Sequence, residues 1–220
     1  MAMGSQTEQV YAHVRQAILS LEIVPGARLS ERGLESEFGA SRTPVRAALM
    51  RLEGEGLVAR EGRTWQVTPI DLDEVAALAE YREAVEVAAA RLACVRASDD
   101  ELDALATDDV PDGEDAGMRR GSDFHEGLAA LSGNPFLVQA VADAVTRMAR
   151  ARWLELRSEE GRDAAWREHA AIIDAVRARD ADAAASAIAH HTQANLDRLL
   201  ASLRSDRRVF GARGLRIVGQ

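Results

Sequence analysis

Two arginines one helical turn apart, Arg42 and Arg46, lie at the start of a short amphipathic segment of this sequence. Arginines on the first turn of a helix read base edges and bind phosphates, because this end attracts anions and fits the DNA major groove. Ser41 is placed to cap the helix, Pro44 is tolerated in its first turn, and Thr43 projects beside the arginines. The spacing predicts a DNA-binding helix.

The apolar face of this helix must pack on further elements, and the flanking sequence supplies them. Apolar residues repeat at helical spacing before it and alternate after it. The patterns predict helices over 8–21, 30–38 and 41–54, then two strands over 57–60 and 64–67. Three helices and a hairpin predict a winged helix-turn-helix.

The pattern changes after residue 70 and stays helical almost to the end. Five histidines occur, and all but His13 lie in this second part. Residues 108–117, rich in Asp, Pro and Gly, predict a loop. Helices are predicted over 72–97, from 98 onward, and over 118–132, 135–157, 162–178 and 181–203. The fold class is therefore mainly α, with a DNA-binding domain over 1–70, an all-helical bundle over 71–205 and an arginine- and glycine-rich tail over 206–220.

The charge of the chain is unevenly divided, which matters for nucleic-acid binding. The net charge is −9 over 220 residues, yet residues 1–70 hold eight arginines and eight glutamates and are neutral. A neutral domain can bind DNA if its arginines share one face. No apolar run approaches the roughly 20 residues that span a bilayer, and no secretory signal begins the chain, so we expect a cytoplasmic protein. The single cysteine, Cys94, excludes an internal disulfide and is expected to be buried.

With these residues in view, the chain resembles a known family. The run from Leu29 to Val67, above all SRTPVRAALMRLEGEGLV, resembles the winged helix of GntR-type bacterial transcription regulators. The second part resembles the helical FCD effector domain of their FadR-like branch. The residues that carry this resemblance are Tyr81-Arg82 with Glu86, FHEGLAALSGNPFL from Phe124, and EHAAIIDAVRARDADAAASAIAHH from Glu168.

The resemblance implies DNA contacts at Arg32, Arg42 and Arg46. Ser41 and Thr43 join them on the first turn of the predicted recognition helix, and Arg63 at the hairpin tip is placed to reach a phosphate or minor groove. The hairpin, REGRTWQV, departs from the glycine-rich tip common in the family. An alternative for Arg32 is a salt bridge with Glu31 or Glu35.

The resemblance also implies a metal site. In many FCD domains three histidines and one aspartate hold a divalent ion, and the matching histidines are His125, His169 and His191. Such imidazoles suit zinc, nickel or a similar metal. The family's aspartate lies four residues before the first histidine, where this chain has Gly121. Asp123 points roughly 200° away in a regular helix and can ligate only if that helix begins late or is distorted.

Three interpretations of the histidines stay open. They hold a metal ion, with an effector carboxylate completing the coordination; or they join Arg82 in binding an anionic ligand without metal; or they are ordinary buried histidines. Arg82 interrupts an apolar helix face and needs a partner, which is either Glu86 one turn along or an effector carboxylate.

Together these features predict a ligand-responsive transcription regulator, in most such cases a repressor. We expect a homodimer on a palindromic double-stranded operator with half-sites about one turn, near 34 Å, apart. The expected effector is a small organic anion bound by Arg82 and the three histidines. The alternatives are a regulator that has lost its metal or effector response, and a three-histidine metalloenzyme with Glu126 or Glu168 as its base. We expect no enzyme, because no catalytic motif accompanies the histidines.

Overall fold

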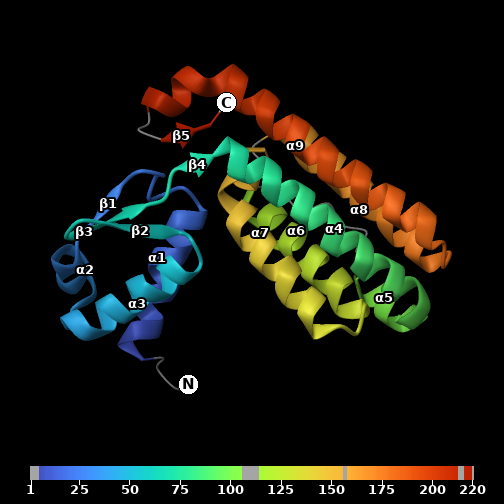
Figure 1. Ribbon diagram of the computed structural model, residues 1–220, viewed down its shortest axis with the longest axis horizontal. Coiled ribbons are helices and arrows are strands. Elements are labelled where there is room, and N and C mark those ends of the chain that lie inside the picture. Colours follow the sequence, from blue (N-terminus) through green and yellow to red (C-terminus); the bar gives the residue numbers. More distant parts are fainter. Residues whose placement is uncertain (1–4, 106–113, 156–157, 213–215, 220) are drawn as a thin grey trace. The chain divides into compact units, whose positions relative to one another are not determined.

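The computed structural model describes residues 5–105, 114–155, 158–212 and 216–219. These residues form two compact units, one running through Leu72 and including the chain from Asp206, the other covering Asp73–Ser205. Helices are the main elements of both units, and two small sheets lie in the first (Figure 1). The predicted fold class, mainly α with a winged helix-turn-helix followed by a helical bundle, is confirmed.

The first unit is a winged helix-turn-helix built on a three-stranded sheet. An unpredicted two-residue strand extends the expected hairpin, giving an antiparallel sheet in the order β1-β3-β2. Its elements are α1 (Gln6–Leu19), β1 (Arg28–Leu29), α2 (Glu31–Phe38), α3 (Arg42–Gly54), β2 (Val58–Glu61) and β3 (Thr64–Val67).

The turn between α2 and α3 is set by local chemistry. The Ser30 hydroxyl caps α2 by accepting a hydrogen bond from the Gly33 amide at 3.0 Å. Gly39 ends α2 with a left-handed φ of 57°, a conformation that glycine adopts without a Cβ clash. Ser41 holds the N-cap position of α3, but its side chain makes no capping hydrogen bond, so that detail of the prediction is wrong.

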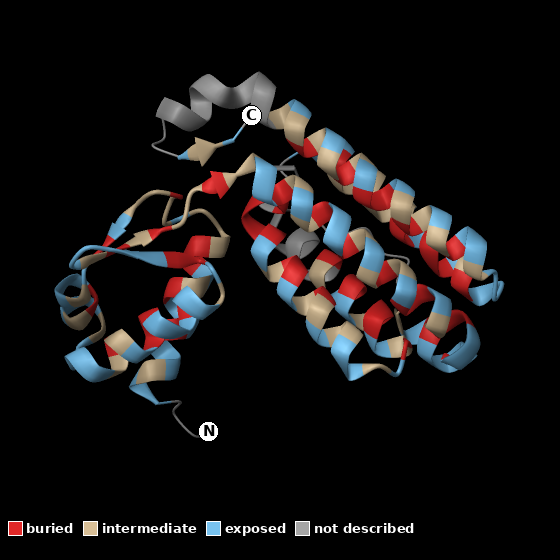
Figure 2. Cartoon of the chain, viewed as in Figure 1, coloured by how far each residue is buried: buried red, intermediate tan, exposed pale blue. Residues whose placement is uncertain are grey.

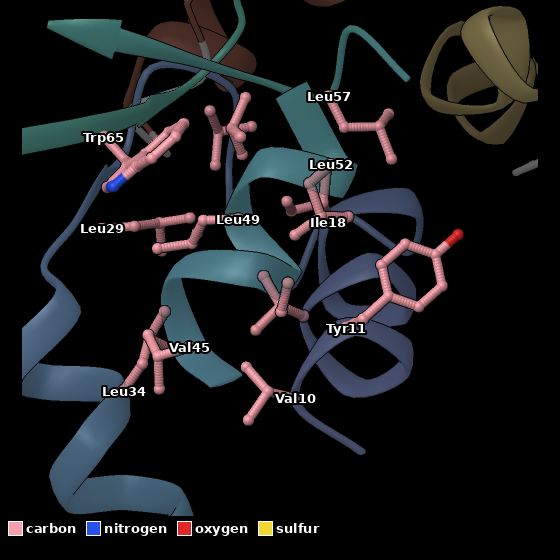
Figure 3. Close-up of a cluster of buried hydrophobic side chains, with 14 of the residues drawn as sticks. Val10, Tyr11, Ile18, Leu29, Leu34, Val45, Leu49, Leu52, Leu57 and Trp65 are labelled. Carbon is pink, nitrogen blue, oxygen red and sulfur yellow. The ribbon is translucent and has the colours of Figure 1, made fainter. Parts of the chain in front are cut away.

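The core of the first unit orients α3. Ile18, Val45, Leu49 and Leu52 are fully buried, and they belong to one hydrophobic cluster that includes Trp65 of the sheet (Figure 3). This leaves the opposite face of α3 outside the core. Burial of such aliphatic side chains contributes about 1.5–3 kcal/mol each.

The second unit contains only helices among its described residues. Along these helices, stripes of buried residues alternate with stripes of exposed ones (Figure 2). α6 begins at Glu114, so the loop prediction is wrong for residues 114–117, while 108–113 lie outside the described residues. No described helix is both long and apolar enough to cross a bilayer. The helices are α4 (Leu72–Arg96), α5 (Asp99–Leu105), α6 (Glu114–Leu131), α7 (Pro135–Glu155), α8 (Glu159–Arg177) and α9 (Ala181–Ala212).

The described end of the chain returns to the first unit. β4 (Ile70–Asp71) pairs in parallel with β5 (Ile217–Val218). The Arg216 amide donates to the Pro25 carbonyl at 3.0 Å, which ties this segment to the loop before β1. Neither strand was predicted, since two-residue strands leave no periodic signal.

Replacing Gly39 with alanine tests the turn before the recognition helix. A Cβ at Gly39 meets nothing within 4 Å, so the change acts only on the backbone. We expect Gly39→Ala to lower the free energy of unfolding by about 1 kcal/mol in urea titrations, because the left-handed φ remains. Gly54→Ala is the control, since Gly54 is helical with equal room around it and should gain stability. Equal effects of the two changes would contradict this account.

Candidate functional site

The first turn of α3 presents the predicted DNA-contacting residues. Arg42 and Thr43 are exposed, while Arg46 is half-buried one turn along. Arg32 on α2 and Arg63, which follows Gly62 in the tight turn of the hairpin, are exposed as well. The structure thus places the predicted residues on α2, the start of α3 and the hairpin of one unit.

One carboxylate of α2 holds both arginines of the recognition helix. Glu31 accepts from Arg42 Nε at 2.8 Å and from Arg46 Nε at 3.1 Å. It also accepts from Trp65 Nε1 at 3.3 Å, and its side chain is only 13% exposed. The bond from Arg42 is the main cause that lowers the pKa of Glu31 to about 2. The sequence suggested Glu31 only as a partner of Arg32.

This contact fixes how the arginines can be used. Glu31 engages the Nε of each guanidinium, and the terminal Nη1–Nη2 edge is the fork that pairs with guanine O6 and N7. Glu31 therefore limits the rotamers that Arg42 and Arg46 can adopt. Less conformational entropy is then lost on binding.

In the second unit, the three histidines meet in the interior of the helical bundle. His125 comes from α6, His169 from α8 and His191 from α9, and all three are buried, whereas His190 is exposed. One nitrogen of each lies within 4.8 Å of one nitrogen of the other two. With Arg82 and Glu86 of α4 they form what we call the polar centre.

Two carboxylates set the tautomers of two histidines. His125 Nδ1 lies 3.0 Å from Glu86 Oε2, and His191 Nδ1 lies 2.8 Å from Glu168 Oε2. Each Nδ1 therefore carries the proton, and each Nε2 keeps a lone pair. These two Nε2 atoms are 3.3 Å apart, as expected for two nitrogens bound at about 2.0–2.1 Å to one tetrahedral zinc ion.

Arg82 lies between these lone pairs. Its Nε donates to Glu86 at 2.5 Å. This is one of the two partners that the sequence suggested for Arg82. Its Nη2 lies 2.7 Å from His125 Nε2 and 3.2 Å from His191 Nε2. Asn195, not predicted from the sequence, also donates to His191 Nε2 at 2.9 Å.

Burial keeps all three imidazoles neutral. It is the largest cause that lowers the pKa of His125, His169 and His191 well below the usual histidine value. Positive charge on Arg82 lowers the pKa of His125 further, and the neighbouring imidazoles do the same for His169 and His191. Neutral imidazoles are the form that binds transition metals.

His169 is the least satisfied member of the polar centre. Its ring stacks on Phe124 with centroids 3.9 Å apart. Neither of its buried nitrogens has a hydrogen-bond partner in the described structure, and Arg82 Nη1 is in the same position. Orphaned buried polar atoms are costly, so the centre fits a further ligand, either a metal ion on the histidine nitrogens or an acceptor.

Of the three carboxylates considered for other roles, Asp123 and Glu126 are exposed, and Glu168 binds His191 of the polar centre. α6 is already regular at Asp123, which is exposed, so Asp123 does not substitute as a metal ligand. Glu126 is exposed too. Glu168 accepts hydrogen bonds from His191 and, at 2.7 Å, from Arg198 Nη1. Its carboxylate is therefore already engaged and is not placed to act as a general base.

Comparison with known proteins identifies the family. Residues 6–64 match the bacterial regulatory proteins of the gntR family, and residues 77–194 match the FCD domain. The chain belongs to the GntR family. With its FCD domain, this GntR-family protein fits the FadR-like branch and is a DNA-binding transcription regulator.

Individual relatives agree with this placement. The regulator is 35% identical over 199 residues to an HTH-type transcriptional regulator in an unstable DNA locus of Streptomyces ambofaciens, covering 86% of the chain and 82% of the relative. It is 25% identical over 201 residues to the HTH-type transcriptional repressor RspR of Escherichia coli (strain K12), covering 84% and 85%. The E. coli McbR/YncC structure superposes with a TM-score of 0.72 at 21% identity, over 90% of this chain and 99% of that chain, which supports the fold.

The low pKa of Glu31 gives its contacts a defined pH dependence. Because the folded pKa lies near 2, below that of the unfolded chain, these contacts stabilise fully above about pH 5 and are lost as the pH falls toward 2. We expect Glu31→Gln to lower the free energy of unfolding by about 1–2 kcal/mol at pH 7. At pH 3.5 the difference in unfolding free energy between the variant and the parent protein should be smaller. Urea titrations at both pH values measure this. Glu37→Gln, an exposed change on the same helix, is the control, and a pH-independent gap would refute the role of the charge.

Proposed function

We propose that this regulator is a ligand-responsive repressor that binds a short palindromic operator as a homodimer in the cytoplasm. The observation that carries the DNA part is the pair Arg42 and Arg46, held by Glu31 at the first turn of α3. The similarity to RspR, named a repressor, supports the sign of regulation. No enzymatic role is proposed.

Dimerisation follows from the size of the DNA-reading surface. One recognition helix covers only a few base pairs, which is too few for a tight and specific site. Two copies related by a dyad would read half-sites about one helical turn apart. The operator is accordingly expected to have two-fold symmetry.

The polar centre is the proposed effector site. Arg82, His125, His169 and His191 gather buried donors and lone pairs that are only partly satisfied. An organic anion with a carboxylate would accept from Arg82 and from a histidine N–H. Such a ligand regulates DNA binding only through different affinities for the DNA-competent and incompetent states.

The three histidines are also the proposed ligands of a transition-metal ion. Zinc or nickel would be held by His125, His169 and His191 and would offer open coordination positions to the effector. Arg82 Nη2 now donates to two of the same lone pairs, so this nitrogen must leave them first. A carboxylate gives Arg82 another acceptor, which links anion binding to metal binding.

Selection from a pool of randomised duplex DNA with the full-length protein tests the DNA part. We expect enrichment of a two-fold symmetric sequence whose half-sites are centred about 10 base pairs apart. On that DNA, Arg46→Ala should weaken binding at least about fivefold, because a bidentate guanine contact is worth about 1–3 kcal/mol.

Arg91→Ala is the control, since Arg91 is an exposed arginine of the helical unit, paired with Asp182, and should leave DNA binding unchanged. Enrichment without symmetry would refute the dimeric operator. Full affinity in Arg46→Ala would refute the role of the recognition helix.

Elemental analysis of protein purified without chelator or histidine tag tests the metal. We expect close to one equivalent of a transition metal, lost in His191→Ala because one buried nitrogen ligand is removed. His190→Ala is a closely matched control, since His190 is the neighbouring residue but exposed. Equal metal content in the two variants would refute the assignment.

A further inference from the structure

Arg152 of α7 lies against Gly121 of α6 at the edge of the polar centre. A Cβ at Gly121 would come closest to Arg152 Nη2 and would lie 3.9 Å from His169 Cε1. Arg152 is only 5% exposed, and its Nη1 donates to Ser122 Oγ at 3.4 Å. The missing side chain of Gly121 is therefore what gives this guanidinium its place near His169.

The groups around this place call for an acceptor. A guanidinium offers only donors, and a neutral histidine offers one N–H. Arg82 Nη1 and both nitrogens of His169 are buried without a partner in the described structure. An ionised carboxylate accepts several hydrogen bonds and donates none, so it complements this set of donors.

We propose that Arg152, admitted by Gly121, is an anion-binding residue of the polar centre, and that a small carboxylate-bearing ligand binds between its guanidinium and His169. Where the resemblance expects the carboxylate of a metal ligand, this chain brings a positive charge. Arg152 thus selects the ionised ligand over its neutral analogue. The identity of this ligand as the effector rests on the proposed function, whereas the anion site rests on the geometry alone.

Titration of chelator-treated, full-length protein with sodium malonate tests the proposal. Sodium nitrate of equal ionic strength is the reference, and malonamide is the uncharged analogue of malonate. We expect malonate, but neither nitrate nor malonamide, to raise the thermal unfolding midpoint in a saturable way. In Arg152→Met the dissociation constant for malonate should rise at least tenfold. Arg147→Met, which removes an exposed charge from the same helix, should behave as the parent protein.

Gly121→Ala separates binding from folding. Alanine is the better helix former, and its methyl group displaces only the flexible end of Arg152. We expect this variant to fold, with a malonate dissociation constant raised at least severalfold. If Arg152→Met does not fold, Arg152→Gln removes the same charge while keeping a polar side chain, and the same loss is expected.

Two results would overturn the anion site. One is an unchanged malonate affinity in the folded Arg152 and Gly121 variants, and the other is a parent protein that responds equally to malonate, malonamide and nitrate. Malonate binding through Arg152 without any change in DNA affinity would support the site and refute its effector role. If the DNA-binding proposal failed its test, the malonate titration would be unaffected. A failure of the DNA-binding proposal can therefore be distinguished from a failure of the anion site.

Discussion

A guanidinium buried in the helical bundle needs several partners, and the order of the polar centre follows from that need. Arg82 takes the carboxylate of Glu86, and the same carboxylate turns His125 so that its Nε2 faces Arg82. Removing one partner of such a pair leaves a charge away from water, typically at a cost of about 3–5 kcal/mol. The pair therefore fixes the histidines in one arrangement, and their lone pairs face each other.

The DNA-binding unit uses the same chemistry near its surface. There a single carboxylate, Glu31, orients two arginines rather than two histidines. Its contacts are partly open to solvent, because the Arg42 side chain is 67% exposed. Charge pairing of the same kind is thus buried in one unit and partly open to solvent in the other.

Local periodicity was enough to predict most helices, the winged hairpin and the face of α3 that packs inward, since each depends on residues within a few positions of one another. The roles of Glu31 and Arg152 could not be predicted in this way. Glu31 contacts Arg42 and Arg46 only after α2 packs on α3. The position of the Arg152 guanidinium requires that Gly121, on another helix, has no side chain. Glu86 carried a local signal, its one-turn spacing from Arg82, while its contact with His125 spans 39 residues.

The pairing of β4 with β5 secures a second connection between the two units. The chain passes between the two units twice, once after Leu72 and again at Asp206. Two units joined by one segment of chain can rotate about that segment. Two units joined by two segments can rotate only if both segments twist. The pairing of β4 with β5 therefore ties both of these crossings to the first unit. A chain lacking β5 would lose this second attachment, and the connection after Leu72 would remain.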